Sequence, residues 1–223
     1  MPGRLGKSGG IIYFVAMNLS RPLVFLLFCW PLIGRSQSGG TDAPYHISYS
    51  QSKTGGVLLF KGAKHSLAVD IVGDSIQTTN QPNYLQIDNI VVQVSMVPLP
   101  NGVEGSDLAI PRQKEGLTGY VQYEMDYFHK ELHLSTTMLR QEWISIKDRP
   151  FLLWTFHCAP PAGQKLSAAV IDQLYLSVLW HEQVVDLNCA VFDQKDMTKA
   201  RAMLLQMAES MRPFPATAAP LNR

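Results

Sequence analysis

The sequence has few cysteines, no cluster of charge of one sign and no apolar segment long enough to cross a membrane. Basic and acidic residues are nearly balanced, at 19 and 18 of 223 residues. Binding to nucleic acid or to an anionic membrane surface depends on clustered lysine and arginine. The even balance therefore excludes a nucleic-acid-binding protein and disfavours attachment to an anionic membrane.

The most apolar part of the chain lies near its start. The run LVFLLFCWPLI, residues 23–33, is eleven residues long, whereas a membrane-spanning helix needs about 20. The first 38 residues contain four basic residues and no acidic residue, which is the layout of a signal peptide. We expect residues 1–38 to be a signal peptide and the mature chain to be periplasmic or secreted, with no stable membrane insertion after cleavage.

Processing of this leader leaves alternatives open. Small residues allow cleavage before Gln37 or before Gly39, and translation starts at Met1 or at Met17. Cys29 lies inside the apolar run, without the small residues that precede a lipid-modified cysteine. A lipoprotein anchor is therefore disfavoured.

The rest of the chain has the length of one domain. Removing 38 residues leaves 185, with 15 basic and 18 acidic residues and a net charge of −3. Residues 39–56 are rich in Ser, Gly and Thr and are predicted to be a linker. Residues 57–212 are predicted to form a single α+β domain, and residues 213–223 a flexible tail.

A hairpin and then a helix are predicted in the first half of the domain. Residues 90–97 alternate with a period of two and predict a strand, which ends at Pro98. NYLQI, residues 83–87, is its expected partner across an Asp88-Asn89 turn. Apolar residues then recur at helical spacing, which predicts an amphipathic helix: Leu117, Val121, Met125, Phe128 and Leu132.

Two further hairpins are expected. EWISIK and FLLWTFHC flank residues 148–150, and LYLSVLWH and VVDLNCAVF flank a turn near Glu182 and Gln183. Their β-branched and aromatic residues favour strands.

A C-terminal helix follows the last hairpin. Asp193 is its expected N-cap, Asp196 favours the positive end of the helix dipole, and Pro213 stops the helix. Its expected buried stripe is Met197, Ala200, Leu204, Ala208 and Met211.

Two cysteines remain after processing, Cys158 and Cys189. They are either a disulfide or two buried apolar side chains. In an antiparallel meander one strand separates them, so they lie about 9.6 Å apart. A disulfide tolerates at most about 7 Å between Cα atoms, so we expect buried free thiols.

The stretch DYFHKELHL is the only candidate for a metal site. In zinc hydrolases a glutamate directly follows the first histidine, but here that position is Lys130, and Glu131 points away from both histidines. Asp126, His129 and His133 share a predicted helix face, which is turned toward solvent. We therefore expect a solvated helix face and no metal.

Catalytic motifs are scarce. His157 and Cys158 are adjacent on a strand and point to opposite faces, so they cannot pair as base and nucleophile. His181 near Glu182 could supply a catalytic partner, but a hairpin end with polar residues explains these two residues at least as well. The sequence contains no G-x-S-x-G, no C-x-x-C and no phosphate-binding glycine loop. No catalytic, cofactor-binding or metal-binding residue is assigned, no cofactor is expected, and the protein is not expected to be an enzyme.

Five aromatic residues are candidates for a binding surface, although most of them are expected in the core or at its rim. They are Tyr120, Tyr123, Tyr127, Trp143 and Trp154.

The order of elements resembles a known superfamily. NIVVQVSMVPLP, a strand with a proline-flanked end before a helix, and QLYLSVLWHEQVVDLNCAVF running into DMTKARAMLLQMAESMR are similar to the PsbP-like superfamily, the PsbP and DcrB-like α-β-α sandwich proteins. The resemblance covers Val57 to Arg212. It implies an antiparallel β-sheet flanked by helices, and a binding or assembly accessory without a shared reaction.

Three functions follow from these observations. The first is an exported, non-enzymatic protein that binds another protein or an envelope component. The second is a small-molecule carrier with a site between the sheet and the first helix, or at residues 159–169. The third is a hydrolase with an unrecognised site.

Overall fold

The computed structural model describes residues 45–52, 55–62, 65–79, 83–98, 108–159 and 172–215. The predicted signal peptide with its cleavage sites, Cys29, and residues 160–169 lie outside these ranges. Two helices are present in the described part, α2 Ile110–Lys130 and α3 Met197–Ser210, and a 3-10 turn, η2 Gln194–Asp196, precedes α3. The strands are β1 Tyr45–Ser52, β2 Gly55–Gly62, β3 Ser66–Ile71, β4 Ile76–Thr78, β5 Tyr84–Ile87, β6 Ile90–Pro98, β7 Ser135–Ile146, β8 Arg149–Ala159, β9 Asp172–Trp180, β10 Gln183–Val191 and β11 Arg212–Pro213.

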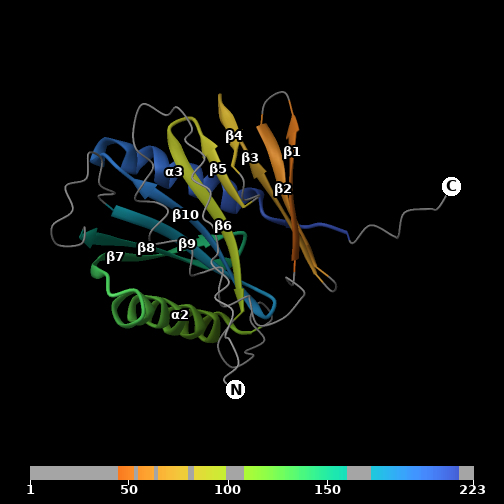
Figure 1. Cartoon of the computed structure of the whole chain (residues 1–223). Helices are drawn as coiled ribbons and strands as arrows, with labels where there is room; N and C mark the ends of the chain where they lie inside the picture. The colour runs from red at the N-terminus through yellow and green to blue at the C-terminus, as the bar shows by residue number, and fades with distance from the viewer. Residues whose placement is uncertain are drawn as a thin grey trace, which may run out of the picture.

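The strands form two antiparallel sheets. The larger has seven strands in the order β4-β5-β6-β10-β9-β8-β7, and the smaller has four in the order β1-β2-β3-β11. Figure 1 shows α2 on one face of the larger sheet and α3 on the other, with the smaller sheet beside α3. The predicted α+β class and the α-β-α sandwich are confirmed. The smaller sheet was not predicted.

Helix α2 forms where the apolar periodicity predicts it. Leu117, Val121, Met125 and Phe128 are buried, and Leu132 lies just beyond the helix end, partly buried against the same core. The stripe therefore fixes which side of α2 faces the sheet.

Helix α3 ends at Ser210, shortly before Pro213, which was predicted to stop it. Asp193 Oδ1 accepts a hydrogen bond from the backbone N of Lys195 at 3.1 Å, so its cap serves the η2 turn that leads into the helix. The buried side contains the predicted Ala200, Leu204 and Ala208, and also Met203 and Met207.

The three predicted hairpins of the larger sheet are confirmed, with two turns displaced by one residue. The β5–β6 turn is at Asp88-Asn89, as expected. The β7–β8 turn is at Lys147-Asp148 rather than at residues 148–150. Both of these residues have positive φ, 50° and 61°, which a two-residue hairpin turn requires. The β9–β10 turn is at residues 181–182.

The predicted linker, residues 39–56, is wrong from Tyr45 onward. Residues 45–52 form β1, and its residues pair in register with β2. Tyr45 lies opposite Gly62, and its ring fills the space that a side chain at Gly62 would take. Tyrosines that cover glycines stabilise this strand pair, although its composition is that of a linker.

The predicted tail from residue 213 is also corrected at its first residues. Arg212 and Pro213 pair with β3 as β11, and the backbone N of Phe214 donates to the carbonyl of Ser66 at 3.0 Å. Residues 216–223 lie outside the described part.

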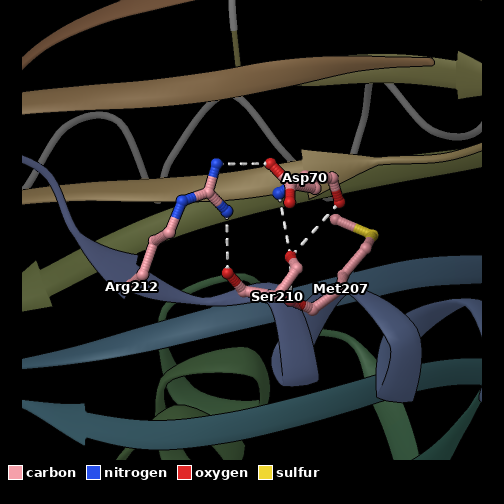
Figure 2. Close-up of polar contacts among 4 residues, drawn as sticks. All are labelled: Asp70, Met207, Ser210 and Arg212. Carbon is pink, nitrogen blue, oxygen red and sulfur yellow. Dashed lines mark hydrogen bonds and ion pairs between the residues drawn. The ribbon is translucent and has the colours of Figure 1, made fainter.

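Polar contacts tie the end of α3 to β3 (Figure 2). The Ser210 hydroxyl accepts from the backbone N of Asp70 at 2.8 Å and donates to the carbonyl of Met207 at 2.7 Å. The Arg212 guanidinium donates to Asp70 Oδ1 at 2.7 Å and to the carbonyl of Ser210 at 3.0 Å. These bonds hold the smaller sheet against the helix that packs on the larger one.

The larger sheet separates two apolar cores. The larger core joins α3, the smaller sheet and one face of the larger sheet, and Cys189 belongs to it. The other core lies under α2 and contains Cys158. The predicted meander β8-β9-β10 and the burial of both thiols are confirmed.

Candidate functional site

A buried polar network lies where α2 meets the larger sheet. Tyr120 on α2 donates its hydroxyl hydrogen to Asp186 Oδ2 on β10, and the hydroxyl of Ser177 on β9 donates to Asp186 Oδ1. The indole Nε1 of Trp154 on β8 donates to the Ser177 oxygen at 2.9 Å. All four side chains are buried, so the network links α2 to three neighbouring strands.

Burial shifts the pKa values of Asp186 in this network and of the nearby Glu124. Desolvation raises the pKa of Asp186 to about 6, although the hydroxyls of Ser177 and Tyr120 partly oppose the shift. Glu124, one helical turn after Tyr120, has its pKa raised to about 8 by desolvation and then by the charge of Asp186. At neutral pH Glu124 is therefore mostly protonated, while Asp186 is mostly ionised.

Polar side chains continue across the same sheet face beyond α2. Helix α2 packs on β7, β8 and β9, whereas Tyr84, Gln93 and Asn188 lie on β5, β6 and β10. These three residues are directly opposite one another in the strand register. Asn188 Nδ2 donates to Gln93 Oε1 at 3.2 Å, and Asn188 also faces Tyr175 on β9. We call Tyr84, Gln93, Asn188 and the neighbouring Gln173 the polar row.

Exposed apolar side chains gather on α2 and β7. Five large apolar residues are exposed in the described part, and four of them belong to these two elements, which pack on each other. They are Ile110, Tyr123, Leu139 and Trp143; the fifth, Val72, follows β3. Lys114 Nζ lies 5.1 Å from the centroid of the Trp143 ring, so the two elements meet there.

The candidate aromatic residues divide between core and surface. Tyr120 and Trp154 are buried in the core under α2, and Tyr127 is partly buried against it. Only Tyr123 and Trp143 are exposed, at 53% and 38%. The expectation that most of the five belong to the core or its rim is confirmed.

The histidines of DYFHKELHL do not share a helix face, contrary to our expectation. Helix α2 ends at Lys130, and His133 has a φ of 53°, which directs the chain away from the helix axis. Asp126 pairs with Lys130 at 2.7 Å, and the His129 Nε2 lies 3.1 Å from the carbonyl of Thr136. Within the described residues no three potential metal ligands come together. That this stretch binds no metal stays a prediction.

His157 and Cys158 point to opposite faces, as the strand geometry requires. The His157 Nδ1 lies 3.3 Å from Asp172 Oδ1, and Gln194 Nε2 donates to Asp172 Oδ2 at 2.6 Å. Cys158 is in the core under α2. Sequence reasoning missed Asp172 as the partner, because β9 begins at that residue after a connection that no motif marks.

His181 has a partner that the sequence did not indicate. Its ring stacks on His65 with the centroids 3.5 Å apart, and His181 occupies the β9–β10 turn with a φ of 54°. The stack connects the larger sheet with the segment that starts β3. Only the pairing of the two sheets, which the sequence does not reveal, brings these residues together.

The fold and these contacts define an α+β sandwich protein with a polar sheet face. No protein-family model matches the chain, and no curated protein matches its sequence. Among solved structures the chain is similar to the solution structure of cyanobacterial PsbP (CyanoP) from Synechocystis sp. PCC 6803, with a TM-score of 0.42 and 9% identity over 79% of this chain and 96% of that chain.

Cyanobacterial PsbP is a member of the PsbP-like superfamily, which the sequence pattern of this chain resembles. Neither described helix is long and apolar enough to cross a membrane.

Proposed function

We propose that this chain is an exported, non-enzymatic binding protein that holds a protein partner on the surface of α2 and β7. The observation that carries the proposal is that four of the five exposed large apolar residues in the described part belong to these two elements. We define the α2–β7 surface by Ile110, Leu139 and Trp143 together with Lys114. Tyr123 is not part of it, because it lies about 180° around α2 from Lys114. Exposed apolar patches bordered by polar groups are typical of protein interaction sites.

The geometry of β7 favours docking through side chains. β7 is the last strand of the seven-stranded sheet, and the register with β8 shifts between Met138 and Arg140. The bulge leaves Leu139 unpaired with β8 and 52% exposed. Bulges and charged residues such as Arg140 protect an edge against strand addition. A partner would therefore contact Leu139 and Trp143 by their side chains.

The polar groups under α2 support a structural role rather than catalysis. The carboxylate of Asp186 accepts from two hydroxyls, and Ser177 accepts from Trp154 while donating to Asp186. The polar groups of Tyr120, Trp154, Ser177 and Asp186 are therefore used in the network, and burial under α2 keeps a substrate away from them. Export is supported by the basic, acid-free leader with its eleven-residue apolar run.

The experiment is affinity capture with the chain recovered from the extracytoplasmic fraction, where it should start at Gln37 or Gly39. We expect one partner to be captured by the native chain and by Val72→Ser, but to be lost with the double change Leu139→Ser and Trp143→Ser. Val72 is a matched control because it is similarly exposed, at 48%, but follows β3. Equal capture by all three proteins, or recovery of the chain only in the cytoplasm with residue 1 or 17 at its start, would contradict the proposal.

A further inference from the structure

In the described part of the chain, the strands at the ends of the two sheets differ in how their open edges are protected. An end strand presents unpaired backbone N–H and C=O groups, which proteins usually protect by short length, charged side chains, proline or a β-bulge. β4 has three residues, β11 has two and ends in Pro213, and β7 has Arg140 and a bulge. β1 is the exception, because it has eight residues, all paired in register with β2, and none of them is Lys, Arg, Asp, Glu or Pro.

β1 also leaves apolar side chains only partly covered. Tyr45, Ile47 and Tyr49 alternate along the strand and pack against the larger core, but all three are only partly buried. β2 lies on one side of them, and on the other side of β1 no described strand follows (Figure 1). A further strand at this edge would cover these side chains and would pair the free backbone groups of β1.

The sequence of β1 favours β1 of a second copy as the added strand. Two strands related by a two-fold axis are antiparallel, and their apolar side chains stay on the same face of the joined sheet only when one residue lies opposite itself. Placing Ser48 opposite Ser48 of the second copy pairs residues 45–51 of both strands. Ile47 then lies opposite Tyr49 of the second copy, and this pair occurs twice. Pairs of an aromatic and a β-branched residue are among those that stabilise antiparallel strands.

The neighbouring registers fit less well. An axis at Tyr49 would place Ile47 opposite the polar Gln51, and an axis at Ile47 would shorten the pairing to residues 45–49. With the axis at Ser48, the one histidine of the strand, His46, lies opposite Ser50, so no two ionisable side chains of like charge face each other. The sequence of β1 is therefore complementary to itself in this register.

We infer that two copies of this chain form a symmetric dimer through β1, in which their four-stranded sheets join into one continuous sheet. The two-fold axis makes the contact closed, because each β1 edge is used by the other and none remains for a third copy. The inference is independent of the proposed protein partner, since β1 belongs to the smaller sheet and the α2–β7 surface lies on the larger one.

Sedimentation equilibrium of the purified mature chain in the micromolar range tests the inference. We expect a monomer–dimer equilibrium in the native chain. Ser48→Lys places two like charges opposite each other, so the dissociation constant of the dimer should rise by about fivefold or more. Ser145→Lys, at an exposed serine of the end strand β7, should leave it unchanged. A native chain that stays monomeric, or a Ser48→Lys dimer as tight as the native one, would overturn the inference.

Mixing two variants distinguishes loss of pairing from misfolding. Ser48→Glu alone should weaken the dimer as Ser48→Lys does, because each variant brings like charges together. An equimolar mixture of the two should form a mixed dimer more tightly than either variant forms its own, because Lys then lies opposite Glu. A mixture that associates no more tightly than the separate variants would refute the register and the inference with it.

One further comparison separates this test from that of the protein partner. The protein with Leu139→Ser and Trp143→Ser should dimerise like the native chain. Ser48→Lys should still capture the partner of the α2–β7 surface. Loss of the dimer in the first protein would place the contact between copies on α2 and β7 and would overturn the inference.

Discussion

Glu124 is a buried residue of α2 whose charge state affects how the helix packs on the sheet. It is buried on the sheet side of the helix and near Asp186, and its pKa is raised from 4.5 to about 8. Because the folded chain binds this proton more tightly than the unfolded chain does, the stabilisation is complete below pH 4.5 and is lost as the pH rises to about 8. Asp186 acts in the same direction between pH 3.8 and about 6.

Replacing Glu124 with glutamine should therefore remove part of the pH dependence of stability. We expect the free energy of unfolding of the native chain to fall by roughly 2–4 kcal/mol between pH 5 and pH 8, since one pKa unit corresponds to about 1.4 kcal/mol. Glu124→Gln should flatten most of this decline, whereas Glu115→Gln, on the exposed side of α2, should not. Urea unfolding at pH 5, 6.5 and 8 measures the free energy of unfolding. An equal decline with pH in the native chain and in Glu124→Gln would disprove this role of Glu124.

Neither acid could be assigned to this network from the sequence. Asp186 lies inside an apolar strand and Glu124 inside an amphipathic helix, and both look like solvent-facing residues until the strand order is known. The strand order places Asp186 beside Ser177, and the helix then covers both. A contact between residues 66 positions apart in the chain depends on the fold and leaves no local pattern.

At the scale of elements, the parts with a clear apolar pattern were predicted and the others were missed. Helix α2 and strand β6 have repeats of 3.6 and two residues, and strands β8, β9 and β10 are rich in β-branched and aromatic residues, so their positions were predicted within a few residues. Strand β1 was interpreted as a linker because Ser, Gly and Thr dominate its neighbourhood. Its stability depends on Tyr45 and Tyr49 covering glycines of β2, a contact between strands.

The β1–β2 pair provides a test with a matched control. A methyl group at Gly62 would overlap the carbonyl oxygen of His65 and the Tyr45 ring, whereas one at Gly119 on α2 would meet nothing. We expect Gly62→Ala to destabilise the chain by about 1–3 kcal/mol. Gly119→Ala should stabilise it by about 0.5–1 kcal/mol, because glycine is unfavourable inside a helix. Thermal unfolding compares them, and a Gly62→Ala protein as stable as the native chain would show that β1 does not pack as described.

At the scale of the whole molecule, the seven-stranded sheet separates two apolar cores. α2 and its core lie on one side, and α3 with the four-stranded sheet lies on the other. The apolar stripes predicted the two helices, and the resemblance to the PsbP-like superfamily implied that they flank the sheet. The sequence could not predict the second sheet, since its strands lie at both ends of the domain and meet only through β3 and β11. The contacts of Ser210 and Arg212 with Asp70 join these ends.

The separation of the two cores by the sheet determines how the two cysteines should react. Cys158 and Cys189 lie in different cores, with β9 between their strands. Burial also raises the pKa of the Cys189 thiol to about 12, so the reactive thiolate is scarce. We expect both thiols to react with a maleimide far more slowly in the native chain than in urea, and peptide mapping without reductant to show no bond between them. A Cys158–Cys189 linked peptide from the native chain would require these strands to be neighbours on one face, and would contradict the strand order β10-β9-β8 on which both cores depend.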